Sequence, residues 1–258
     1  MTYFKLLGLL LALIFEMTFF TSTAEAISIS TKRLYLSPEK DLATIYVVSE
    51  EPALQRCQIK IRDAEIGDNS VIQFLPEGKV STNSPKNLIR FAPRRFEVSS
   101  GQFQNVKLSY RRRPGVTNGE YIGLVAIRCE TITDDNELNT TKRVTLKPTI
   151  VLNVPVIVHT GDIAASASFK TLELSKNQID VTIETTGNRA ITGDLEIIEK
   201  STGQVLASKP EMSIYWESPS KKVTLTIDKS FNLPLTVRFK EDPKFGGNLL
   251  IEQQITAF

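Results

Sequence analysis

VTLKPTIVLNVPVIV, residues 144–158, followed directly by HTGDIAASAS, residues 159–168, is the stretch that decides the fold. In the first segment every even position is apolar or proline, and most of the polar residues fall on odd positions. This period of two is typical of a β-strand, and the segment is much longer than the usual strand of about 5–6 residues. The second segment is small, polar and turn-prone, which predicts a linker near residue 160. The single histidine, His159, is expected on the surface of that linker.

On both sides of this linker, short segments rich in Val, Ile, Leu, Phe, Tyr and Thr alternate with turn residues, and sustained helical periodicity is almost absent. That pattern is typical of an all-β sandwich. Strands are expected at 29–36, 43–49, 54–61, 71–76, 87–93, 96–100, 104–110, 120–129 and 145–158, and then at 169–175, 178–187, 194–200, 204–208, 222–228, 235–240 and 249–258. We therefore predict two immunoglobulin-like β-sandwich domains in series, at 27–159 and 160–258, because each set has about the number of strands such a domain needs.

Residues 1–26 have the organisation of a signal peptide. Lys5 precedes the apolar run LLGLLLALIFEMTFF, and STAEA places small residues at the two positions that a signal peptidase recognises, which predicts cleavage after Ala26. A membrane anchor is the alternative, but Glu16 interrupts a run that is already shorter than the ~20 residues needed to span a bilayer. The mature chain is expected outside the cytoplasm, without membrane insertion.

The charge balance and the cysteine content narrow the possible classes of protein further. With 31 Lys and Arg against 29 Asp and Glu, the near-neutral balance argues against a general nucleic-acid or membrane-surface binder.

Cys57 and Cys129 are the only cysteines, and export would allow them to form one disulfide. They fall in the predicted strands 54–61 and 120–129, which we take as the third and sixth strands of an immunoglobulin-like sandwich, where these two strands are antiparallel neighbours. Two buried thiols are the alternative.

No catalytic centre is evident in the sequence. A single histidine in a predicted linker is a poor basis for a His-dependent triad, and two cysteines without CxxC spacing do not make an ordinary zinc site. The acidic run at 134–137 lacks the glycine and ligand spacing of a calcium loop. No glycine pattern for binding a nucleotide follows a predicted strand. The sequence therefore predicts a protein without enzymatic activity, metal or cofactor.

These features together resemble the periplasmic pilus-assembly chaperones of the chaperone–usher pathway. The most specific stretch is PRRFEVSSGQFQNVKLSYRRRPGVTNGEYIGLVAIR, residues 93–128, with its Pro-led strand, Gly-Gln turn, alternating strand and Tyr opening the next strand. NVPVIV at 153–158 and TTGNRAI at 185–191 are similar to the archaic branch of this family. The resemblance covers essentially the whole mature chain. It implies a periplasmic protein whose partners are pilus subunits and an outer-membrane usher.

In that family the last strand of the first domain completes an unfinished subunit fold, a mode known as donor-strand complementation. The resemblance implies donor side chains at Val144, Leu146, Ile150 and Leu152, whereas Pro148 on the same face cannot donate a ladder hydrogen bond. The alternative for these side chains is that they all fill the first domain's own core.

The family also holds the subunit's terminal carboxylate with two basic residues. Arg33 matches the first, but NVPVIV lacks the second, a lysine. Arg112 and Arg113, in the loop before Tyr121, are the predicted substitutes, with a solvated loop as the alternative. The missing lysine favours a second hypothesis, a secreted immunoglobulin-like binding or structural protein without a subunit-delivery role.

Overall fold

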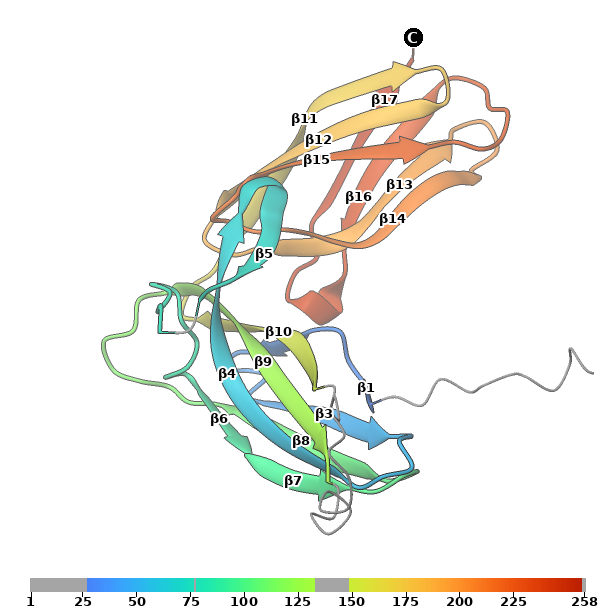
Figure 1. Ribbon diagram of the computed structural model, residues 1–258. Helices are drawn as coiled ribbons and strands as arrows, with labels where there is room; N and C mark the ends of the chain where they lie inside the picture. The colour runs from blue at the N-terminus through green and yellow to red at the C-terminus, as the bar shows by residue number, and fades with distance from the viewer. Residues whose placement is uncertain (1–26, 77, 133–148, 257–258) are drawn as a thin grey trace, which may run out of the picture.

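The computed structural model describes residues 27–76, 78–132 and 149–256 (Figure 1). The described chain is built from β-strands, with short 3-10 turns at Asp68–Ser70 (η1) and Pro243–Phe245 (η3). The all-β prediction is confirmed. The predicted signal peptide, the acidic run and the donor positions Val144 and Leu146 lie outside the described residues.

The first ten strands form two sheets, which we call the N-terminal sandwich. One sheet has the order β1-β3-β8-β6, and the other has the order β2-β10-β9-β4-β5, with β7 paired to β4. The strands are β1 (Ile27–Ile29), β2 (Leu34–Leu36), β3 (Leu42–Ser49), β4 (Gln55–Gly67), β5 (Val71–Phe74), β6 (Ile89–Ala92), β7 (Arg95–Val98), β8 (Phe103–Tyr110), β9 (Gly119–Thr131) and β10 (Ile150–Thr160).

The remaining strands form two further sheets, the C-terminal sandwich, with the orders β11-β12-β15 and β14-β13-β16-β17. The strands are β11 (Ala165–Ser175), β12 (Gln178–Gly187), β13 (Ile191–Glu199), β14 (Val205–Ile214), β15 (Ser220–Thr226), β16 (Leu235–Glu241) and β17 (Leu250–Ile255). Side chains of β12 show why the segment forms a half-buried strand. Ile179, Val181 and Ile183 point into the core, while the residues between them are only partly buried.

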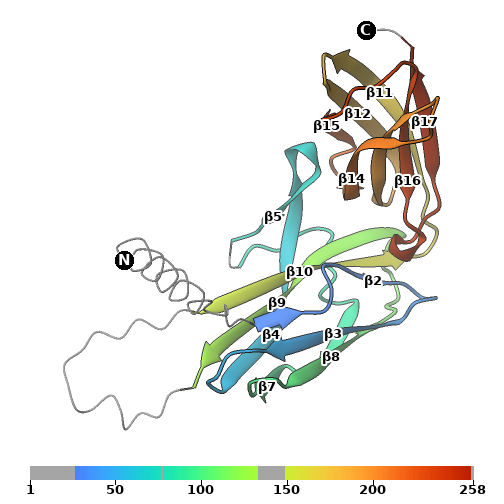
Figure 2. The same ribbon diagram turned by 90° about the vertical axis from the view of Figure 1, so that its right-hand side faces the viewer.

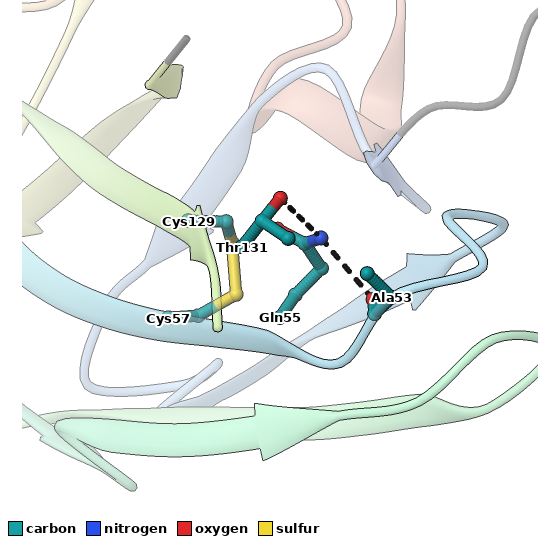
Figure 3. Close-up of a disulfide and its surroundings, with 5 residues drawn as sticks. All are labelled: Ala53, Gln55, Cys57, Cys129 and Thr131. Atoms are coloured by element: carbon teal, nitrogen blue, oxygen red, sulfur yellow. Dashed lines mark hydrogen bonds between the residues drawn. A yellow bond between two sulfur atoms is a disulfide. The ribbon is translucent and has the colours of Figure 1, made fainter. Parts of the chain in front are cut away.

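Cys57 and Cys129 are paired in a disulfide inside the N-terminal sandwich (Figure 3). They face each other directly in the β4–β9 register, and both side chains are buried in the core between the two sheets. Nearby, Gln55 donates from Nε2 to Thr131 Oγ1 at 2.9 Å and to the Ala53 carbonyl at 3.2 Å. The strand order predicted from the sequence placed the two cysteines correctly.

The linker is shorter than the sequence predicts. β10 continues through Thr160 and β11 begins at Ala165, so residues 161–164 alone join them. His159 therefore belongs to β10 and is buried, and the expectation of a surface histidine is wrong. The linker also packs closely against the end of β12. Gly187 has φ +119°, and a Cβ on it would lie 2.1 Å from the Ala164 carbonyl oxygen, so this position requires glycine.

The β4–β5 hairpin extends beyond its sheet and reaches the C-terminal sandwich (Figures 1 and 2). At its tip, Ser70 Oγ donates to the Ser218 carbonyl at 2.6 Å and accepts from the Tyr215 amide at 3.0 Å. Asn69 Oδ1 also accepts from the Lys222 amide at 2.9 Å. The side chains of the hairpin tip thus form hydrogen bonds with the backbone of the C-terminal sandwich.

Candidate functional site

One edge of β10 is open along half of the strand. β10 pairs with β9 over its whole length, from Ile150 to Thr160. On the other side it pairs only with β2, in parallel, at Val156–Val158. Within the described part of the chain, the six residues Ile150–Pro155 have no strand on that side. Backbone groups along an open edge can pair with a strand of another chain.

The burial of the β10 side chains changes at the same point along the strand. Val154, Val156 and Val158 are buried in the core between the sheets, whereas Ile150 is 38% exposed. Leu152 is partly buried and packs against that core. The even face therefore fills the core in the second half of β10 and becomes progressively exposed toward the open half. Of the four predicted donor residues, the structure describes only Ile150 and Leu152.

Arg33 lies where the open edge ends. It immediately precedes β2, whose first residue, Leu34, is the register partner of Val156. Its Nη1 donates to Thr192 Oγ1 at 2.8 Å and to Ser213 Oγ, both on the C-terminal sandwich. The guanidinium also lies 5.9 Å from the ring centroid of Tyr215. A guanidinium has five N–H donors, and these two hydrogen bonds use Nη1 alone.

Lys221, on β15, is a second cation beside Arg33. Its Nζ donates to the Ser213 carbonyl at 3.0 Å, so the two cations form hydrogen bonds with different atoms of the same residue. Burial lowers the pKa of Lys221, and the positive charges of Lys209 and Arg33 add to that shift. Sequence reasoning missed Lys221, because nothing in the local sequence SKKVTLT distinguishes it from an ordinary strand lysine.

The same region contains a cleft of 680 Å³ between the sandwiches, on whose walls lie Arg33, Tyr35 and Phe245. Lys32, Lys40 and Lys244 also line it, which makes its walls basic. Lys244 is paired with Glu211 and Asp242 at 3.2 and 2.9 Å. The cleft is therefore suited to an anionic group.

Arg112 and Arg113 are exposed and lie on the loop between β8 and β9. Arg113 donates from Nε to the Asn87 carbonyl at 3.1 Å, and the contacts that hold Arg33 involve neither residue. The end of this loop does meet the end of β10, where Thr160 Oγ1 donates to the Thr117 carbonyl at 3.3 Å. The structure thus brings Arg33 together with Lys221, and it brings neither loop arginine to them.

A buried polar contact joins the two sandwiches behind the cleft. The His159 Nε2 and the Glu120 Oε2 are 2.8 Å apart, and the same carboxylate oxygen accepts the Ala190 amide at 3.0 Å. Tyr35 packs edge-on against the imidazole, with ring centroids 5.7 Å apart, and against Phe245. Glu120 therefore links β9, β10 and the turn between β12 and β13 of the C-terminal sandwich at one point.

Glu217, on the turn after β14, is a carboxyl group whose pKa this interface raises. Its pKa is raised to about 7, mainly by burial and also by the negative charge of Glu120, while a hydrogen bond from Asn83 Nδ2 at 3.3 Å opposes the shift. Its Oε2 is buried without a hydrogen-bond partner among the described residues. The carboxyl group thus changes charge near neutral pH.

No protein-family model and no curated protein sequence matches the chain. Solved structures do match it, and they share the fold of two-domain β-sandwich chaperones. The YadV chaperone is 10% identical, with a TM-score of 0.50 over 89% of this chain and 99% of that chain. The class 5 fimbriae chaperone CfaA is 13% identical, with a TM-score of 0.47 over 90% of this chain and all of that chain.

A structure of the CsuC–CsuE chaperone–tip adhesion subunit complex, from the archaic chaperone–usher Csu pili of Acinetobacter baumannii, also matches. It is 10% identical over 88% of this chain and 97% of that chain, with a TM-score of 0.47. The resemblance to pilus-assembly chaperones predicted from the sequence is confirmed as a resemblance of fold. No helix among the described residues is long and apolar enough to cross a membrane.

Proposed function

We propose that this protein is a non-enzymatic periplasmic chaperone that binds pilus-type subunits by strand addition and delivers them to an outer-membrane usher. In this proposal residues 1–26 are a signal peptide, 27–159 form the domain that donates the strand, and 160–258 form the second domain. The observation that carries the proposal is the open edge of β10, which ends beside Arg33.

Strand addition uses main-chain hydrogen bonds for affinity and alternate side chains for specificity. The open half of β10 offers both, because no strand in the described part of the chain pairs with it on one side and Ile150 is exposed. Leu152 adds a partly buried apolar side chain next to the core. Val144 and Leu146 extend the same face of the donor strand in the proposal.

In this proposal Arg33 is the first of the family's two basic residues, and Lys221, rather than Arg112 or Arg113, takes the place of the missing second one. Arg33 and Lys221 are both hydrogen-bonded to Ser213, which fixes their positions before a partner arrives. A carboxylate that is taken out of water needs more than one donor, since each charged hydrogen bond contributes about 1.5–3 kcal/mol. We infer that a subunit's terminal carboxylate lies between these two cations.

The alternative is a secreted immunoglobulin-like binding or structural protein without a delivery role. One observation favours it: Arg33 already donates to Thr192 and Ser213, so the same side chain also serves to join the two sandwiches. The two hypotheses differ in what happens when Arg33 is replaced. A chaperone that anchors a carboxylate loses its partner, whereas a structural arginine affects stability alone.

Co-expression with a candidate subunit, followed by purification of the complex, tests the proposal. We expect the subunit to be soluble only with this chain, and we expect Leu146→Asp with Ile150→Asp to reduce the yield of complex at least about tenfold, because carboxylates would have to enter an apolar groove. Leu250→Asp, at an exposed apolar residue of the edge strand β17, is the matched control.

The proposal fails if the subunit stays soluble without this chain or binds the double variant as well as the parent. Arg33→Ala and Lys221→Ala then separate the two hypotheses. Each is expected to weaken a subunit with its native carboxyl terminus more than one whose terminus is amidated. Equal weakening for both forms of the subunit would assign these residues to stability, and the alternative hypothesis would be preferred.

A further inference from the structure

A pocket of 350 Å³ lies on the outer face of the β10-β9-β4 sheet, beneath the segment that follows β5. Five of the residues lining it are basic: Lys60, Arg62, Lys79, Lys86 and Arg128. The pocket is separate from Arg33, which lines a different cleft. We call it the basic pocket.

The positive charge of the basic pocket is only partly compensated. Lys86 is held by Asp63 at 2.6 Å, and Arg128 pairs with Glu130 at 2.7 Å. Both side chains of the Arg128–Glu130 ion pair are exposed, so the pair is weak and another carboxylate can readily take the place of Glu130.

The other three cations have no carboxylate partner among the described residues. Arg62 lies over the ring of Phe74, 6.0 Å from its centroid, whereas Lys60 and Lys79 are exposed. Among the residues that the structure describes, the five cations of the basic pocket therefore have two carboxylate partners. An excess of positive charge that is concentrated on one sheet face favours an acidic partner.

The register of the sheet places this charge next to the open edge. Val151 lines the pocket and is the β10 partner of Arg128 on β9. One row further along, Asn153 is the partner of Ala126, which is in turn the partner of Lys60 on β4. The small side chain of Ala126 leaves room for the pocket between these longer side chains.

A strand added to the open edge would lie about 4.8 Å beyond β10, and about 9.6 Å from β9. Its outward side chains would stand beside Val151 and Asn153, on the same face as the basic pocket. A glutamate on that strand and the long side chain of Arg128 can together span the distance. Lys60, one strand further away, adds to the attraction at longer range.

We propose that the basic pocket selects partners whose added strand carries acidic residues on its outward face. This inference rests on the proposed function, because it assumes that a strand pairs with the open half of β10. It adds a requirement that strand addition alone does not impose: the apolar face of the partner strand enters the groove, and its other face carries negative charge.

Three synthetic peptides test the requirement. Each has nine residues that alternate apolar with polar positions, and they are identical except that two central polar positions are Glu, Gln or Lys. Fluorescence anisotropy with the full mature chain measures their affinities. At low salt we expect the Glu peptide to bind about tenfold more tightly than the Gln peptide, and the Lys peptide to bind more weakly than either. The preference should shrink to about twofold in 0.5 M salt, because screening then acts over about 4 Å.

Charge reversal supplies the specific control. Lys60→Glu with Arg128→Glu alters two exposed side chains and should invert the order, so that the Lys peptide binds best. Lys107→Glu with Lys240→Glu makes the same change in net charge at two exposed lysines on other sheets, β8 and β16. That control should keep the preference for the Glu peptide.

The possible failures are distinguishable. If the three peptides bind equally, or if the control variant inverts the order as well, the basic pocket has no role in selection while strand addition stands. If no peptide binds, the open edge does not accept a strand, and the proposed function fails together with this inference. Loss of binding to phosphatidylglycerol vesicles in the Lys60 and Arg128 variant, without any peptide preference in the parent, would assign the pocket to a lipid surface.

Discussion

Replacing Glu217 with glutamine should make the protein more stable at mildly alkaline pH. Burial holds the pKa of this carboxyl at about 7 in the folded chain, with the charge of Glu120 as a further cause, against an ordinary value of 4.5. The ionised form is thus disfavoured by the fold. Glutamine has the size of the protonated carboxyl group and can still accept a hydrogen bond from Asn83, so it removes the charge while keeping that contact.

The sign and size of the effect follow from the two pKa values. When folding raises the pKa of a carboxyl group, its contribution to the free energy of unfolding is complete below the pKa of the unfolded chain. That contribution is lost as the pH rises through the folded pKa, here about 7. The difference corresponds to at most about 3 kcal/mol. Because Glu217 is partly exposed and solvent screens it, we expect about 1–2 kcal/mol. The Gln variant should therefore match the parent near pH 4.5 and exceed it by that amount near pH 8.

Guanidinium unfolding followed by tryptophan fluorescence is the direct assay, because the only tryptophan, Trp216, is the adjacent residue. Parent and variant are compared at several pH values, so that the titration of all other groups cancels in the difference. Glu50→Gln, at an exposed carboxylate, is the matched control. A Glu217→Gln difference that does not change with pH, or a variant that is less stable than the parent near pH 8, would refute this account of the interface.

Two further predictions concern stability. Replacing Cys57 and Cys129 with serine should lower the free energy of unfolding by about 4 kcal/mol, measured by chemical denaturation, because the disulfide closes a loop with a sequence separation of 72; an unchanged midpoint would contradict this. Glu120→Ala should cost about 2–4 kcal/mol and increase amide exchange at Ala190, since it leaves the buried His159 and that amide without their partner. Loss of stability without faster exchange there would show that Glu120 does not hold the sandwiches together.

The strands could be predicted from the sequence because their signal is local. In β12, Ile179, Val181 and Ile183 repeat with the period of a pleated strand, and all three are buried in the structure. The pairing of Cys57 with Cys129 could be predicted as well, although it is not local, because the order of strands in a sandwich fixes which ones are neighbours.

The interface between the sandwiches could not be predicted in the same way. His159 looks like a linker residue because Thr160 and Gly161 follow it, and its partner Glu120 is 39 residues away along the chain. Lys221 approaches Arg33 only because one sandwich is oriented against the other, and no period or motif reports that orientation. Polar contacts of this kind depend on the packing of whole domains, so a single sequence gives them no local signature.

The alternation in residues 144–158 left open whether the long strand fills the core or offers an edge, and the structure shows that β10 does both. The position of β2 separates the two parts of β10, because β2 pairs with one side of Val156–Val158 alone. Beyond it, Ile150–Pro155 have no strand on that side within the described ranges, and these six residues are about the length of an ordinary strand. Pro155 stands at the junction and has no N–H to leave unpaired, which suits the point where pairing on that side stops. An open edge of that length can accept one added strand, which is the geometry that the proposed strand addition requires.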